Sequence, residues 1–172
     1  MGTDVVSSSR AEEELEIFIR ENQGDFYRLA CSYVKNPDEA MDVVQEAAIK
    51  AFVHLSSLRK PQNMKAWFYR ILVNESLTWL RRKRRVCTVS SEFLDKTQSD
   101  EHAERFDENL DLYKAVLQLE PKLRTVIFLR FFEGMKLEDI AAVTDARLST
   151  VKTRLYRALR KLKEMLGEEI TA

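Results

Sequence analysis

The chain has 172 residues with 28 Lys or Arg against 28 Asp or Glu, so its formal net charge is zero, and its length suits one ordinary domain or two small ones. A hydrophobic fraction of 45%, with 33% charged residues, four Gly and three Pro, favours a helical globular protein over a disordered chain, a collagen or a fold built from loops. No apolar run approaches the roughly 18 to 20 residues of a membrane span and no export signal is present, which predicts a cytoplasmic protein.

The chemistry of the side chains predicts no cofactor, no bound metal and no small-molecule substrate. Cys31 and Cys87 are too few for a disulfide framework, and His54 and His102 do not complete a metal-ligand spacing. We expect both thiols to be reduced and without a chemical role. Since no nucleophile motif or phosphate loop accompanies them, a protein without enzymatic activity is predicted.

Helical periodicity covers most of the chain, which predicts an all-α fold of two small helical domains joined by a flexible linker. Residues 1–10 are expected to be disordered. The sequence Asn36-Pro37-Asp38-Glu39 is a strong helix start, because Asn caps, Pro suits the first turn and acids favour the positive end. The first domain is predicted at 11–86, with helices over 12–22, 25–34, 37–55 and 64–85.

The balanced net charge is the sum of unlike segments. Residues 61–90 carry seven basic groups and one acidic group, residues 91–120 carry three and nine, and residues 146–163 carry seven basic groups and no acid. Two positive surfaces separated by a negative segment suggest two contacts with one polyanion. The acidic stretch 87–109 has the composition of a linker. The second domain follows at 110–170, with predicted helices over 110–118, 121–133, 136–143 and 149–166.

A helix-turn-helix pattern lies within this second domain, where a short amphipathic helix meets a longer one across a tight turn at 137–155. The apolar face expected to be buried consists of Val151, Leu155, Leu159, Leu162 and Leu166. Bases in a major groove would be read by Lys152, Thr153, Tyr156 and Arg157. Phosphate contacts are expected from Ser149, Thr150, Arg154, Arg160 and Lys161. The alternative interpretation is a solvated basic helix in a bundle.

The long helix of the first domain has a narrow polar face made of Arg70, Asn74, Thr78 and Arg81. An Asn flanked by Arg can hydrogen-bond an exposed base, and aromatic rings nearby can stack on unpaired bases. The rings in question are Trp67, Phe68, Tyr69 and Trp79, of which Phe68 and Trp79 are expected in the core. The basic run at 81–85 predicts a phosphate contact.

The helix predicted at 37–55 has two unlike faces. The face expected to be buried carries Ala40, Val44, Ala47, Ala48 and Ala51. The opposite face mixes acids with branched aliphatic residues, which is typical of a protein-docking surface. Its members are Asp42, Gln45, Glu46, Ile49 and Val53.

Three motifs resemble a known family. The sequences DVVQEA at 42–47, AWFYRILVN at 66–74, and LEP at 119–121 followed by the helix-turn-helix resemble the extracytoplasmic-function class of sigma-70 family sigma factors. The likeness covers roughly residues 20 to 165 in family order. Arg147 and Ser149 depart from it, since they replace a common Pro and Gly in the turn.

The resemblance implies a subunit of RNA polymerase that directs the enzyme to promoters, often in an envelope-stress response. Its first domain would melt and read the −10 element and its second would read the −35 element. The −10 residues would be Lys50, Leu58, Arg59, Lys60, Asn63, Trp67, Arg70, Asn74 and Arg81. The family's partners would be promoter DNA, the clamp helices and flap of the core polymerase, and a membrane-anchored anti-sigma factor that can hold the protein at the inner membrane face. The polymerase-docking residues would be Asp42, Gln45, Glu46 and Ile49, and the acidic linker would thread through polymerase channels.

Two other functions compete with this interpretation. One is a helix-turn-helix regulator that binds duplex DNA alone, with the first domain serving for dimerisation or sensing. The other is a small helical nuclease, in which Asp38, Asp42 and Glu46 could gather a metal ion. Tight duplex binding without polymerase would favour the first, and magnesium-dependent DNA cleavage would favour the second.

Overall fold

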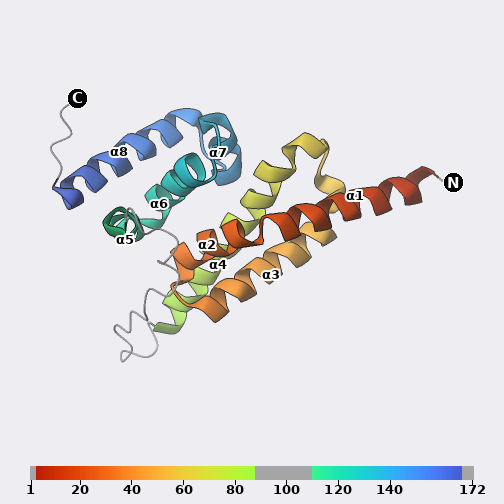
Figure 1. Cartoon of the computed structure of the whole chain (residues 1–172), viewed down its shortest axis with the longest axis horizontal. Helices are drawn as coiled ribbons and strands as arrows, with labels where there is room; N and C mark the ends of the chain where they lie inside the picture. Colours follow the sequence, from red (N-terminus) through yellow and green to blue (C-terminus); the bar gives the residue numbers. More distant parts are fainter. Residues whose placement is uncertain (1–2, 88–109, 168–172) are drawn as a thin grey trace. The chain divides into compact units, whose positions relative to one another are not determined.

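The computed structural model describes residues 3–87 and 110–167. The chain divides into two compact units, Met1–Asp95 and Lys96–Ala172, and every described element is helical (Figure 1). The predicted all-α fold with two helical domains is therefore confirmed. The linker predicted at 87–109 lies outside the described residues, apart from Cys87 at the end of a helix.

The first unit consists, in chain order, of α1 (Thr3–Glu21), α2 (Gln23–Val34), α3 (Pro37–Val53), the 3-10 turns η1 (Leu55–Ser57) and η2 (Pro61–Asn63), and α4 (Met64–Cys87). Helix α1 begins inside residues 1–10, which the sequence predicts to be disordered. Farther along this helix, Arg10 Nε and Glu14 Oε1 form an ion pair at 3.1 Å. Pairs four residues apart stabilise an exposed helix only slightly.

The junction of α2 and α3 forms as its sequence predicts. Lys35 takes a left-handed conformation with φ of 56°, and the Asn36 side chain then accepts hydrogen bonds from the backbone N–H groups of Asp38 and Glu39 at 2.9 and 3.2 Å. These bonds satisfy donors that the first turn of α3 leaves without partners. The cap therefore fixes where α3 begins and how it returns along α2.

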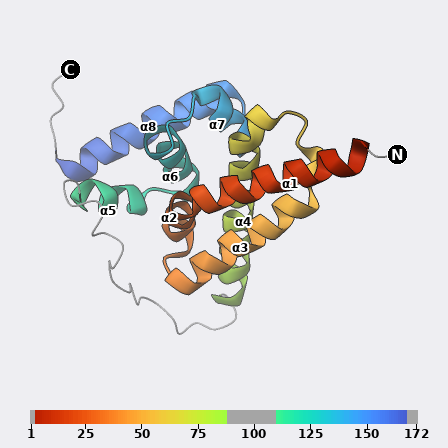
Figure 2. The same ribbon diagram turned by 45° about the vertical axis from the view of Figure 1, so that its right-hand side comes forward.

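Helices α2, α3 and α4 pack against one another (Figure 2). Small side chains permit the close approach, since four alanines are fully buried: Ala30, Ala40, Ala47 and Ala51. An aromatic cluster fills the centre, where the Phe26 ring lies 4.4 Å from Phe68 and 5.3 Å from Tyr69, measured between ring centres. The predicted core position of Phe68 is correct. The same prediction is wrong for Trp79, which is half-buried with the Lys83 ammonium 4.5 Å from its ring centre.

The second unit consists of α5 (Leu110–Gln118), α6 (Pro121–Ile127), a π-helical turn η4 (Phe128–Phe132), α7 (Leu137–Thr144) and α8 (Leu148–Leu166). Helices α5, α6 and α7 all pack on α8 (Figure 1). The helix predicted at 121–133 is thus continued by a π turn that ends at Phe132, with Glu133 as its cap. Gly134 follows with φ of 64°, a conformation that suits glycine.

The buried face of α8 is rotated from the predicted one. Val151 and Leu162 are buried as expected, and Leu155 is half-buried. However, Leu159 is 39% exposed, and the fully buried position beside it is Ala158. A small residue at that position allows α8 to lie close to its neighbours, which turns the larger Leu159 toward the edge of the packed face.

The turn between α7 and α8 closes without the expected glycine. Asp145 takes the left-handed conformation with φ of 50°, which short polar side chains tolerate better than most others. The Ala146 N–H then bonds to the Ala141 carbonyl at 3.0 Å. Arg147 occupies the cap position of α8, and Ser149 already lies inside the helix. The two departures from the family pattern therefore leave a closed helix-turn-helix.

Candidate nucleic-acid interface

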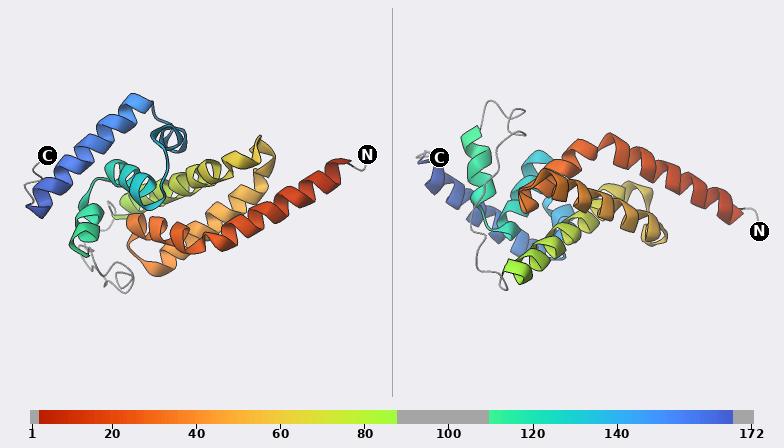
Figure 3. Two further views of the ribbon diagram at one scale, coloured as in Figure 1. Left: turned by 45° about the horizontal axis from the view of Figure 1, so that its top comes forward. Right: turned by 90° about the horizontal axis from the view of Figure 1, so that it is seen from below.

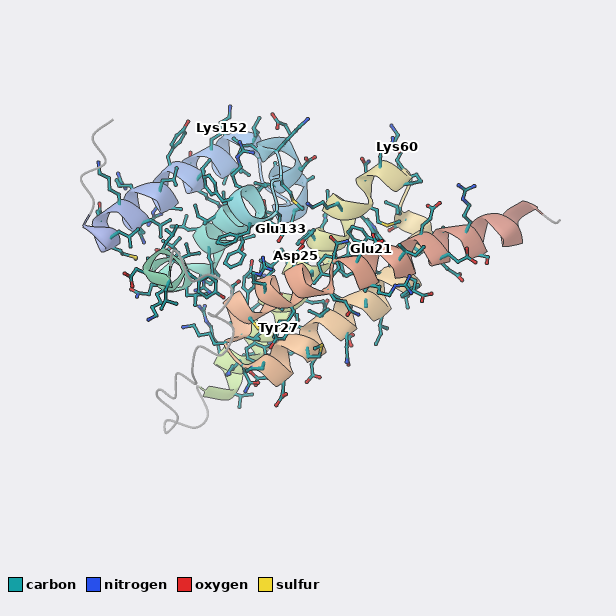
Figure 4. The ribbon with its side chains drawn as sticks, viewed as in Figure 1. Glu21, Asp25, Tyr27, Lys60, Glu133 and Lys152 are labelled. Atoms are coloured by element: carbon teal, nitrogen blue, oxygen red, sulfur yellow. The ribbon has the colours of Figure 1, made fainter. Side chains whose placement is uncertain are left out.

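The outward face of α8 collects the residues predicted to read duplex DNA. Ser149, Lys152, Thr153, Tyr156 and Arg157 are exposed. Lys152 points away from the helix into open space (Figure 4). The side chains that are half-buried at the margin of this face are Thr150, Arg154 and Lys161. Tyr156 is 70% exposed, so a ring and several cations stand together on one surface.

The N-terminal turn of α8 adds backbone donors to this face. The Val151 N–H is the first described to bond within the helix, to the Arg147 carbonyl at 3.0 Å, and no side chain caps the turn. Helix N-termini carry partial positive charge and donors aimed outward, which suits a phosphate group. The Thr153 hydroxyl donates to the Ser149 carbonyl at 2.9 Å, which orients its methyl group and lone pairs.

Glu120 also belongs to this surface, although nothing in the sequence pattern predicts a role in DNA recognition for it. Its carboxylate accepts a hydrogen bond from Lys161 Nζ at 2.8 Å and lies 3.8 Å from Arg157 Nη2. The hydrogen bond from Lys161, followed by the charges of Lys161 and Arg157, lowers the pKa of Glu120. Because 41 positions separate Glu120 from Lys161, only the packing of α6 on α8 brings them together.

The first unit holds the second predicted set on α3, on the loop after it, and on α4. The exposed members are Arg59, Lys60, Asn63, Arg70, Asn74 and Arg81, and the half-buried members are Lys50, Leu58 and Trp67. Figure 3 shows α4 leaving the connection that follows α3 at one end of the unit. Lys60 projects outward from this connection (Figure 4). The loop and the polar face of α4 are thus joined by η2.

Lys50 is held within the unit rather than free for a ligand. Its ammonium lies 2.5 Å from Glu75 Oε1 on α4, and the Glu75 side chain is only 13% exposed. Glu75 directly follows Asn74 in the sequence, so this ion pair ties α3 to the turn of α4 that carries Asn74. The sequence pattern does not indicate Glu75, because 25 positions separate it from Lys50.

Trp67 is anchored to the loop before α4. Its indole N–H donates to the Ser57 hydroxyl at 3.1 Å, which fixes the η1 turn against α4. The indole is half-buried, so part of its ring surface stays accessible. The bond explains how a loop with few buried residues keeps a defined position beside Asn63.

The outward face of α3 is exposed along its length, as the sequence predicts. Asp42, Gln45 and Glu46 lie in solvent. Four apolar side chains accompany them, with exposed fractions between 42% and 70%: Met41, Ile49, Phe52 and Val53. Several exposed apolar residues on one helix beside acids are typical of a protein-binding surface.

Other site types receive no support in the described part of the chain. Among residues 3–87 and 110–167, no group of three His, Cys, Asp or Glu is placed to hold a metal ion, so Asp38, Asp42 and Glu46 do not form the metal site of the nuclease alternative. No described helix is both long and apolar enough to cross a membrane.

The fold and these surfaces define a two-unit helical protein with a helix-turn-helix. Comparison with known proteins agrees: residues 18–86 match the family model for sigma-70 region 2, and residues 109–162 match that for sigma-70 region 4. The RNA polymerase sigma factor SigV of Bacillus subtilis is 42% identical over 154 residues, covering 88% of this chain and 90% of the relative. The sigma-H factor of Pseudomonas aeruginosa is 33% identical over 164 residues, covering 88% and 85%.

A solved structure has the same fold. The sigma factor RpoE from Bartonella quintana, in complex with the anti-sigma factor NepR, superposes with a TM-score of 0.71 at 26% identity, covering 90% of this chain and 99% of that one. The chain belongs to the sigma-70 family of RNA polymerase sigma factors, in its extracytoplasmic-function class. The function predicted from the sequence, a sigma factor for transcription initiation, is thereby confirmed.

Proposed function

We propose that the two units divide promoter recognition between them. Helix α8 enters the major groove of the −35 element and reads bases with Lys152, Thr153, Tyr156 and Arg157. The N-terminal turn of α8, with Arg154 and Lys161, contacts phosphates. The single observation that supports this assignment best is the outward face of α8, where cations and an exposed Tyr156 accompany a helix N-terminus that no side chain caps.

The first unit acts on the −10 element as single strands. Asn74 hydrogen-bonds a base turned out of the non-template strand, and Arg59 and Lys60 hold the phosphates around it. The loop after α3 supports the base from the side, because the bond between Trp67 and Ser57 keeps that loop in place. Lys50 contributes mainly through its ion pair with Glu75, which positions the turn that carries Asn74.

Core RNA polymerase docks on the outward face of α3. Asp42, Gln45 and Glu46 supply charge and hydrogen bonds, and Ile49 supplies apolar area. Exposed apolar residues next to acids fit a partner surface that is itself amphipathic. An anti-sigma factor binds this same face of α3 or the second unit. That proposal is supported by the similar sigma factor RpoE of Bartonella quintana, whose solved structure is a complex with the anti-sigma factor NepR.

The protein acts in the cytoplasm, where its polymerase and promoters are, and a membrane-anchored anti-sigma factor holds it there until an envelope stress releases it. It performs no covalent chemistry, because strand separation at a promoter draws on binding free energy. The acidic linker would thread through channels of the polymerase, where its negative charge could imitate nucleic acid. A pull-down from cells that yields polymerase but no membrane-associated partner would argue against the restraint by an anti-sigma factor.

Reconstituted transcription tests the proposed function. Core polymerase is mixed with the full chain and with fragments of genomic DNA, and the starts of the transcripts are sequenced. The proposal predicts initiation at a limited set of positions that share two upstream elements. If the chain neither binds core polymerase nor changes where transcription starts, the proposal is wrong. Strong duplex binding by the chain alone, without polymerase, would instead favour a stand-alone regulator.

A further inference from the structure

The carboxylate of Glu120 is aimed at the DNA-reading helix rather than at its own. Glu120 is the cap residue of α6, and its backbone carbonyl accepts from the N–H groups of Leu123 and Arg124, both at 2.9 Å. Short polar side chains such as Asp or Ser at this position commonly accept hydrogen bonds from the first turn, and the longer Glu side chain can reach farther. Here the side chain makes no such bond, and its oxygen contacts Lys161 and Arg157 on α8 instead.

The geometry points to Glu120 as a competitor of DNA phosphate for Lys161 and Arg157, which lowers the affinity of the second unit for DNA that offers phosphates alone. The inference rests on the proposed role of α8 in reading duplex DNA. Lys161 and Arg157 lie one helical turn apart, so one carboxylate reaches both. The single charge of Glu120 therefore offsets part of their combined positive charge in the free protein.

The contact is selective among the cations of α8. In the described part of the chain, Lys152, Arg154 and Arg160 make no ion pair, whereas Glu120 Oε1 lies 2.8 and 3.8 Å from Lys161 and Arg157. The Glu120 side chain is 57% exposed. Exposed ion pairs contribute little to folding stability, so stability does not account for this arrangement. The lowered pKa of Glu120 keeps its carboxylate charged beside the two cations.

Competition has a consequence for specificity. When a phosphate displaces Glu120, one anion replaces another, so the gain from that contact is small and fewer counterions are released overall. A base-edge contact by Arg157 adds hydrogen bonds that the carboxylate does not offer in the same place. Binding to a correct sequence is therefore weakened less than binding to any other sequence. Glu120 would raise the ratio of specific to non-specific affinity.

The test compares Glu120→Gln with a matched control, Glu164→Gln. Both remove one negative charge from the second unit and keep the side-chain size, but Glu164 is exposed and makes no described ion pair. The full-length protein is titrated into a fluorescent duplex oligonucleotide of mixed sequence, and anisotropy is followed at several KCl concentrations. Thermal unfolding of each variant, followed by circular dichroism, verifies that both are folded.

We expect Glu120→Gln to bind this non-specific duplex about two- to fivefold more tightly than wild type, the scale of an exposed ion pair. The slope of log affinity against log salt should steepen by about 0.9 for each phosphate newly neutralised. Glu164→Gln should show a smaller effect on both. The effect of Glu120→Gln should also shrink in a Lys161→Gln background, since the released cation is then absent. Unchanged or weaker binding by Glu120→Gln would overturn the inference.

A third variant separates this inference from the proposed function. Lys152→Ala removes a proposed DNA contact that Glu120 does not touch. If Lys152→Ala weakens duplex binding while Glu120→Gln leaves both affinity and slope unchanged, the competition is refuted and the role of α8 stands. If Lys152→Ala binds as wild type does, the role of α8 and the competition fail together. If no variant binds the duplex even at low salt, the competition is refuted, and the role of α8 is decided by promoter binding of the complex with core polymerase.

Discussion

Arg124 offers a direct test of how the second unit holds α8 in place. This residue is only 6% exposed, and its Nη2 donates to the carbonyls of Leu117 and Leu119, both at 2.8 Å. These carbonyls lie at the end of α5, where a helix leaves acceptors without partners. Arg124 on α6 thus fastens α5 to the helix that packs on α8. Replacing it with Met keeps an apolar stem of similar length and removes the donors.

The magnitude follows from two opposing terms. Each hydrogen bond from a charged donor contributes about 1.5–3 kcal/mol. Removing the buried guanidinium also removes its desolvation cost, which returns part of that loss. We therefore expect Arg124→Met to lower the free energy of unfolding of the second unit by about 2–4 kcal/mol. For a unit of this size, that corresponds to a fall in Tm of about 10–25 °C.

Hydrogen exchange on the full-length protein measures this loss of stability in the second unit alone. Amides over 123–129 in Arg124→Met should exchange faster by the factor that corresponds to the lost free energy, which is roughly tenfold for every 1.4 kcal/mol. The control Lys122→Met alters an exposed neighbour on the same helix and should exchange as wild type does. Protection in Arg124→Met within about 0.5 kcal/mol of the control would refute the reasoning, because that is the range of an ordinary surface substitution.

Three further predictions concern the first unit. Asn36→Ala removes the side-chain acceptor of two N–H groups and should lower the free energy of unfolding by about 1 kcal/mol in urea titrations; an unchanged midpoint would show that the cap does not stabilise α3. Burial raises the pKa of Tyr27 from 10.0 to about 12, so the fold favours the neutral phenol. The stability from this group is complete below pH 10 and is lost as pH rises toward 12, a loss that Tyr27→Phe should remove; equal alkaline unfolding of both proteins would contradict it. Ile49→Ala, at a position 57% exposed, should weaken binding to core polymerase by about 1–2 kcal/mol without changing stability; unchanged affinity in a competition assay would place docking elsewhere.

The sequence predicts local structure well where local chemistry decides it. The start of α3 follows from Asn36 and Pro37, and the two helices of the helix-turn-helix follow from apolar spacing. The rotation of α8 about its axis could not be predicted from the sequence. Val151 and Leu162 are buried as predicted, but whether Ala158 or Leu159 lies between them depends on how closely the neighbouring helices approach, and periodicity does not specify that distance.

The candidate site was likewise predictable only in part. Its exposed residues were predictable, because basic and polar side chains fall on the faces opposite the apolar ones. The ion pairs that hold them were not predictable, since Lys50 meets Glu75, and Lys161 meets Glu120, only through the packing of separate helices. Sequence spacing therefore finds the exposed groups that we propose contact DNA, and tertiary structure is needed to find the acids paired with two of them.

The division of promoter recognition between two units is tested most directly by Arg157→Ala and Asn74→Ala. Each variant is assembled with core polymerase, and two quantities are measured on one promoter: affinity for the duplex −35 element and fluorescence of a reporter base that signals opening of the −10 element. Arg157→Ala should weaken duplex binding by about 1–3 kcal/mol. Asn74→Ala should leave duplex binding nearly intact and impair opening. Equal loss of duplex affinity in both variants would contradict the account.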